Sequence, residues 1–131
     1  MATQPTYLFV YGTLRSKVDV PVKHEIAKNW ELIGETEIKG NLYDMGDYPA
    51  AVQGNGTIKG EVYLVKDPTP VFAVLDKYEG SAYTRKLETV TLPNGKEAQA
   101  WVYWYTKPVE GKMLIGDKDY LAYREKKGRV Y

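Results

Sequence analysis

The sequence contains no cysteine, and this absence removes several classes of chemistry at once. Thiol nucleophiles, disulfides, iron–sulfur clusters and thiolate zinc sites all require cysteine. One histidine, His24, is too few for a histidine-rich metal site within one chain, and we expect it at the surface. Only two serines occur, Ser16 and Ser81, and neither lies in a Gly-x-Ser-x-Gly motif. The groups left for catalysis are mainly carboxylates, tyrosines and backbone amides.

An excess of charge of one sign and long apolar runs are also absent. Lys plus Arg number 18 and Asp plus Glu number 17, so the net charge is +1. This balance argues against a large surface for nucleic acid or an anionic membrane. The apolar run at 7–11 is too short for a signal-peptide core, and no stretch approaches the ~20 apolar residues that span a bilayer. We therefore expect a cytoplasmic protein with no nucleic-acid or membrane partner. Nothing in the sequence indicates its oligomeric state.

The residue pattern predicts one domain over residues 1–131. The chain has 131 residues, 44% hydrophobic and 27% charged, which is typical of a globular domain that folds without disulfides or metals. Two segments predict turns, namely Asn55-Gly56 and Pro93-Asn94-Gly95-Lys96, and the second of them predicts a hairpin. Short apolar runs and alternating patterns predict strands at 7–11, 36–45, 57–65, 84–92 and 97–106.

Two or three short helices should accompany these strands. Apolar residues spaced i, i+3, i+4, i+7 predict a helix over 70–79, with Thr69 as its N-cap and Gly80 as its C-cap. Shorter helices are expected near Pro21 and from Asp119. Because the strands are mostly linked as hairpins, the sequence predicts an α+β fold with a barrel-like mixed sheet of five or six strands.

Glu79 is the residue that the helical pattern singles out. It lies at the edge of the predicted apolar stripe and in the last helical turn, where the helix dipole disfavours a negative charge. A partly desolvated carboxyl in this position should have a raised pKa, as a general acid/base near neutral pH requires. The alternative is a solvent-facing glutamate at a frayed helix end, and the periodicity alone favours that alternative.

The segment Tyr11-Gly12-Thr13-Leu14-Arg15 follows the first predicted strand. A strand that runs into a glycine turn leaves backbone N–H groups unpaired, and such groups can bind a carboxylate or phosphate. An ordinary strand-to-loop turn explains an isolated glycine equally simply. No Walker or Gly-x-Gly-x-x-Gly motif is present, so the sequence does not support a nucleotide site.

Three further features have structural and functional interpretations. Trp101, Tyr103 and Tyr105 share one strand face and could stack on bases, but bulk on both faces of this strand favours a core position. The acidic pair in 117–119 could hold a hard cation, although such pairs are common in loops. The basic residues of 124–129 are expected to form a solvated tail.

Several of these residues together resemble the γ-glutamyl cyclotransferase-like family, which includes γ-glutamylamine cyclotransferase and the AIG2-like proteins. His24 falls where many members have an Asn-His pair, although Lys23 stands in place of the asparagine. The segments that carry the resemblance are Phe9-Val10-Tyr11-Gly12-Thr13-Leu14, Tyr48-Pro49-Ala50, Gly60-Glu61-Val62-Tyr63, Leu75-Asp76-Lys77-Tyr78-Glu79-Gly80, and Tyr83 with Arg85. They occur in the family's order and span about residues 7 to 105.

The resemblance implies a small mixed β-barrel of five to seven strands flanked by two or three short helices. It implies that the substrate's α-amine attacks its own γ-carbonyl, which releases 5-oxoproline and an amine. Glu79 would be the acid/base. The residues implied to bind substrate are Tyr11, Gly12, Thr13 and Leu14. We expect Tyr83 and Arg85 to contact the substrate or the residues that bind it, and either Tyr120 or Tyr123 to close the pocket.

This chemistry suits the residues available, because the nucleophile belongs to the substrate and no cofactor or metal is needed. A γ-glutamylamine, such as a fragment bearing γ-glutamyl-ε-lysine, suits the Phe-Val-Tyr-Gly-Thr-Leu motif best. A γ-glutamyl amino acid is the second option. The rival hypothesis is a non-catalytic module that binds a small molecule on the same fold.

Overall fold

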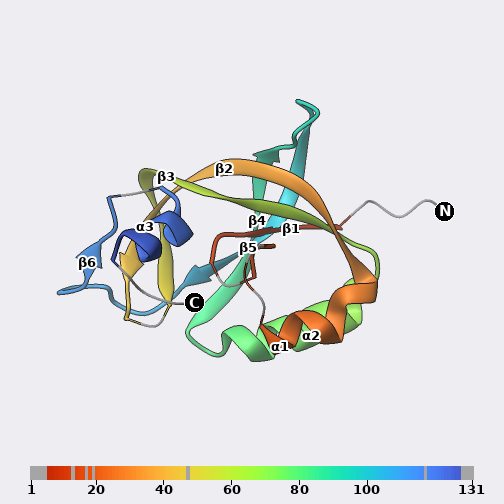
Figure 1. The fold of residues 1–131 in the computed structure, drawn as a ribbon, viewed down its shortest axis with the longest axis horizontal. Helices are drawn as coiled ribbons and strands as arrows, with labels where there is room; N and C mark the ends of the chain where they lie inside the picture. The colour runs from red at the N-terminus through yellow and green to blue at the C-terminus, as the bar shows by residue number, and fades with distance from the viewer. Residues whose placement is uncertain are drawn as a thin grey trace.

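The computed structural model describes residues 6–12, 14–16, 18, 20–46, 48–116 and 118–127. The six strands form one sheet that curls into a half-barrel, with three α-helices around it (Figure 1). This confirms the predicted small mixed barrel with short helices. The elements in chain order are β1 (Thr6–Val10), α1 (Pro21–Ile26), the 3₁₀ helix η1 (Ala27–Asn29), β2 (Trp30–Asp44), β3 (Pro49–Val65), α2 (Pro68–Glu79), β4 (Tyr83–Thr91), β5 (Glu97–Tyr105), β6 (Met113–Leu114) and α3 (Tyr120–Lys126).

β1 lies in the middle of the sheet, whose strand order is β4-β5-β1-β3-β2-β6. It pairs antiparallel with β3 and parallel with β5, and every other pairing is antiparallel. A strand covered on both faces can be apolar throughout, which explains the continuous run Leu8-Phe9-Val10. The chain therefore leaves β1 at the centre of the fold, beside the end of α2.

β2 and β3 are much longer than the sequence predicts, and the turn expected at Asn55-Gly56 is wrong. Both residues lie inside β3, opposite an irregularity of β2 between Lys39 and Asn41. The Gly56 amide donates a hydrogen bond of 3.1 Å to the Asn41 side chain, and a Cβ at Gly56 would collide with that side chain. The glycine therefore serves close packing at a bend of the sheet rather than a chain reversal.

α2 confirms the predicted helix, with a corrected start. It begins at Pro68, with Asp67 at the N-cap position, so Thr69 lies within the first turn. Gly80 ends it as predicted, because its φ of 83° suits glycine and its amide donates to the Asp76 carbonyl at 3.0 Å. This cap fixes where the chain turns after Glu79.

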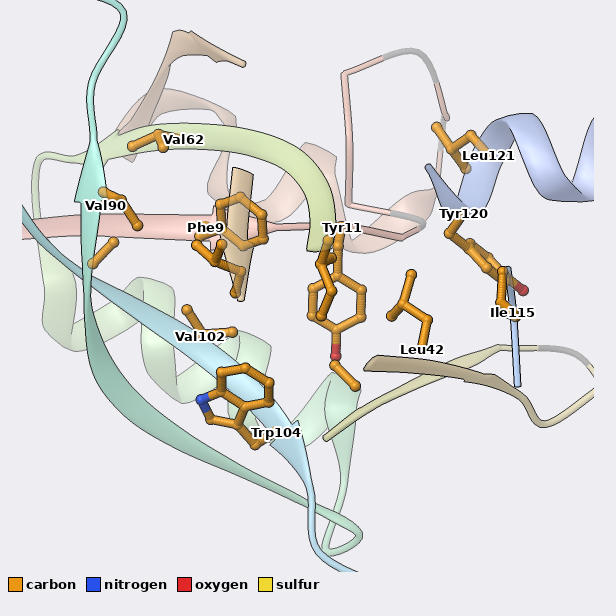
Figure 2. Close-up of a cluster of buried hydrophobic side chains, with 14 of the residues drawn as sticks. Phe9, Tyr11, Leu42, Val62, Val90, Val102, Trp104, Ile115, Tyr120 and Leu121 are labelled. Atoms are coloured by element: carbon orange, nitrogen blue, oxygen red, sulfur yellow. The ribbon is translucent and has the colours of Figure 1, made fainter. Parts of the chain in front are cut away.

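Two apolar clusters cover the two faces of the sheet. Val102 and Trp104 of β5 belong to one cluster (Figure 2), whereas Tyr103 belongs to the other, with Phe72 of α2. The prediction that β5 is covered on both sides is confirmed. Of the three rings considered as a base-stacking platform, Tyr103 is only 4% exposed and Trp101 packs edge-on against Phe72, which favours the core interpretation.

The two remaining helices begin close to their predicted positions. α1 starts at Pro21, and the residue Asp19 lies outside the described part of the chain. Asp119 is the N-cap of α3 and accepts hydrogen bonds from the Leu121 and Ala122 amides. Within the described residues, every helix is too short or too polar to cross a bilayer.

Candidate functional site

A pocket of about 430 Å³ opens where β1 ends and α2 ends. Its walls come from distant parts of the chain, because the central position of β1 brings together the end of β1, the end of α2, and Tyr48 with Pro49. Five of the residues that the sequence suggests for the site line it: Tyr11, Gly12, Leu14, Glu79 and Tyr83. The other lining residues are Phe9, Val10, Tyr48, Pro49, Tyr78, Ala82 and Tyr103.

Glu79 is the acidic residue among those that line this pocket. It is half-buried in the last turn of α2, and no described residue donates a hydrogen bond to its carboxylate. Burial raises the pKa of Glu79 to about 7, because the charged form loses hydration without gaining a partner. A carboxyl with this pKa can both accept and return a proton near neutral pH.

Two tyrosines beside Glu79 have hydroxyls engaged with backbone carbonyls. The Tyr11 hydroxyl donates to the Tyr103 carbonyl at 2.6 Å, and the Tyr83 hydroxyl donates to the Pro49 carbonyl at 2.7 Å. Burial, and secondly the negative charge of Glu79, raise the pKa of both phenols. These tyrosines therefore stay neutral and shape the pocket, and Figure 2 shows Tyr11 within the buried cluster.

Gly12 forms the pocket wall next to β1. A Cβ at this position would lie 3.2 Å from the Pro49 ring, so the backbone approaches Pro49 more closely than a side chain comfortably allows. The Arg15 amide donates to the Gly12 carbonyl at 3.1 Å, which closes a turn around Leu14. Thr13, also suggested for substrate binding, lies outside the described residues.

Arg85, which we expect to contact the substrate or the residues that bind it, does not line this pocket. Its guanidinium binds the Asp76 carboxylate at 2.8 and 3.0 Å and stacks over the rings of Phe72 and Trp101. The hydrogen bond from Arg85 is the main cause that lowers the pKa of Asp76. Arg85 thus holds α2 near its C-terminal end, about one turn before Glu79.

Tyr123 also lies away from the pocket lining. Its hydroxyl donates to the Asp44 carboxylate at 2.7 Å, which anchors α3 to the end of β2. Tyr120 is fully buried and equally absent from the lining. The carboxylate of Asp119 caps α3 and pairs with Arg15, and the described residues contain no group of three potential metal ligands.

Several residues that line the pocket are not predicted from the sequence to belong to the site. Tyr48 and Pro49 belong to a motif shared with the family, but only the fold shows that they line the same pocket as Glu79. Tyr103 was identified as a core residue, and it contributes both a wall and the carbonyl that holds Tyr11. The alternation of residues along the strand predicts on which face of the sheet Tyr103 lies. Its proximity to Tyr11 depends on the parallel pairing of β1 with β5, which the sequence does not predict.

Comparisons with known proteins agree with this fold and show a family. Residues 8–122 match the family described as Gamma-glutamyl cyclotransferase, AIG2-like. The chain is 40% identical over 117 residues to the Gamma-glutamylcyclotransferase family protein YtfP of Escherichia coli K12, covering 87% of this chain and 95% of that protein.

Two solved structures share the fold. The solution structure of ytfP from Escherichia coli has a TM-score of 0.66 at 38% identity and covers 88% of this chain and 96% of its own. The crystal structure of a mouse AIG2-like protein has a TM-score of 0.75 at 22% identity and covers 90% of this chain and 89% of its own.

Proposed function

The chain belongs to the Gamma-glutamyl cyclotransferase, AIG2-like family, and we propose that it releases 5-oxoproline and a free amine from a γ-glutamyl compound. The observation that carries this proposal is the half-buried Glu79 carboxyl, whose pKa is about 7, in a pocket that also contains the Gly12 turn. The substrate class is a γ-glutamyl amine or a γ-glutamyl amino acid. A cytoplasmic location stays a prediction.

The reaction needs a proton carrier and a folded substrate. The Glu79 carboxylate takes a proton from the substrate's α-ammonium, and the freed amine attacks the γ-carbonyl carbon. The C–N bond to the leaving amine then breaks as the leaving nitrogen is protonated. Two protons leave the α-nitrogen and two reach the leaving nitrogen, so Glu79 returns to its starting state. One carboxyl acting in turn as base and acid contributes about 10²–10⁴-fold to the rate.

The pocket walls would hold the substrate in the bent shape that ring closure requires. The amides of Gly12 and Leu14 would bind the glutamyl α-carboxylate, while the rings of Tyr11 and Tyr83 restrict the methylene chain. Such orientation of two reacting groups can lower the barrier by roughly 7–11 kcal/mol. The nucleophile and electrophile both belong to the substrate, so the chemistry calls on no serine, cysteine or metal.

Release of 5-oxoproline from a panel of γ-glutamyl amines and γ-glutamyl amino acids tests the proposal. We expect release from at least one member, its abolition by Glu79→Gln, and no effect of Glu97→Gln, a matched change of an exposed glutamate on β5. Release that survives Glu79→Gln in a folded variant would refute the role of Glu79. No release from either class would favour a module that only binds small molecules.

A further inference from the structure

Arg15 is a buried arginine beside the pocket that the proposed reaction does not use. Only 5% of it is exposed, and it directly follows Leu14 in the pocket wall. Its backbone amide closes the turn onto the Gly12 carbonyl at 3.1 Å. An arginine is almost never this deeply buried unless its charge is paired, so its partners indicate what the residue does.

The guanidinium of Arg15 lies among three carboxylates, of which that of Glu35 on β2 is the most distant, at 3.9 Å from Nη2. Its Nη1 donates to Asp119 at 2.9 Å, and its Nε lies 3.7 Å from Glu61 of β3. Asp119 is itself fixed, because it caps α3 and because the Lys118 carbonyl accepts from the Lys59 amide of β3 at 2.8 Å. The segment after β1 is thereby tied to β3 and to the start of α3.

The backbone beside Arg15 is anchored by the same groups. Glu61 lies opposite Val10, the last residue of β1, and its two carboxylate oxygens accept from the Ser16 amide at 2.6 Å and the Ser16 hydroxyl at 2.8 Å. The Lys23 ammonium donates to the Arg15 carbonyl at 2.9 Å and to the Val18 carbonyl. After β1 ends, side-chain hydrogen bonds therefore hold the backbone in place of the hydrogen bonds between strands.

We propose that Arg15 is a positioning residue, whose bridge between Glu61 and Asp119 fixes the orientation of the Gly12 and Leu14 amides. A turn held only by its own backbone hydrogen bond would sample several orientations, and binding would then carry the cost of ordering it. The buried bridge removes that cost before substrate arrives. The anchoring follows from the contacts alone, whereas its effect on turnover rests on the proposed function.

Three substitutions weaken the contacts that Arg15 and Ser16 make with Glu61 and Asp119, and all three keep a positive charge at position 15. Asp119→Asn keeps an oxygen to cap α3 but loses the ion pair, Ser16→Ala removes one hydrogen bond to Glu61, and Arg15→Lys keeps the charge without the planar fork. The control is Glu31→Gln, which breaks the exposed pair with Lys66 at 3.6 Å on β2.

Two measurements on these variants decide the proposal. Amide hydrogen exchange of the peptide covering 8–16 should become faster in Asp119→Asn and Ser16→Ala, with α2 and the Glu31→Gln control unchanged. In turnover, KM should rise about tenfold in Asp119→Asn while kcat stays within about twofold, since one charge-assisted hydrogen bond is lost before substrate binds. The pH at which the rate rises should not move, because Glu79 is not touched.

Other outcomes overturn the inference in distinguishable ways. Unchanged exchange at 8–16 in both variants would show that the bridge does not hold the turn. A fall in kcat at constant KM, or a shifted pH profile, would show that Arg15 acts on Glu79 instead. If the unmodified protein releases no 5-oxoproline, the proposed function fails, and hydrogen exchange alone then decides whether Arg15 positions the turn.

Discussion

Replacing Glu79 with glutamine should stabilise the protein above pH 7 while it abolishes catalysis. The pKa of Glu79 is about 7 in the fold and 4.5 in its ordinary setting, so the folded state binds a proton that the unfolded state releases between these values. The free energy of unfolding of the unmodified protein must therefore fall as pH rises from 4.5 through 7. Glutamine cannot ionise, so the free energy of unfolding of the variant should not fall in this way as pH rises.

The size of the effect follows from the same two pKa values. At 1.36 kcal/mol for each pKa unit, full desolvation of the charge would destabilise the ionised form by about 3 kcal/mol. Glu79 lies in an open pocket where water screens its charge, so we expect roughly half of this, about 1–2 kcal/mol, above pH 8. Below pH 4.5 the two proteins should have nearly equal stability.

Urea unfolding at half-unit pH intervals from 4 to 9 measures this difference. The gap between Glu79→Gln and the unmodified protein should open above pH 4.5 and level off above pH 8. Glu97→Gln, on the exposed surface of β5, should show no such growth with pH. A gap that is constant across the range, or one that closes as pH rises, would refute the assignment of a desolvated carboxyl at Glu79.

Three further outcomes are expected. The initial rate of 5-oxoproline release should rise with pH around a midpoint near 7, as the Glu79 carboxylate forms; a flat profile between pH 5 and 8 would argue against this base. Gly60→Ala should lower the free energy of unfolding by about 3 kcal/mol, because its Cβ would lie 2.6 Å from the Phe9 ring, whereas Gly116→Ala has open space and should change little. Arg85→Lys should cost about 1 kcal/mol in urea unfolding through loss of its two-point carboxylate contact and ring stacking, and no change would show that this brace of α2 is dispensable.

Several elements could be predicted because their determinants are local in sequence. The hairpin at 93–96 forms as expected, with the Leu92 amide donating to the Lys96 carbonyl at 2.8 Å and Gly95 at φ 85°. Gly80 ends α2 for the same kind of reason, since only a few consecutive residues set the turn. The start of α2 was misplaced by two residues because proline and capping side chains occur at several adjacent positions, 67–70.

The long strands could not be predicted, because their length depends on partners rather than on local pattern. Asn55-Gly56 has the sequence of a turn, yet it lies in the stretch 53–56 of β3 that bulges out unpaired opposite Gly40 of β2, between long paired segments. The same limit applies to Arg85 and Tyr123, because their partners lie far from them in sequence or on another element. Arg85 binds Asp76, Tyr123 binds Asp44, and neither side chain lines the pocket.

The sequence by itself determined the fold class, the C-terminal end of the main helix, and the candidate acid at Glu79 with the Gly12 turn, because runs, caps and motifs of a few residues encode them. Only the tertiary structure decided what surrounds that acid and what holds the turn. Tyr11 meets the Tyr103 carbonyl across 92 residues, and Arg15 meets Asp119 across 104. Contacts at such separations exist only once the central strand has paired on both sides, and no local pattern contains them.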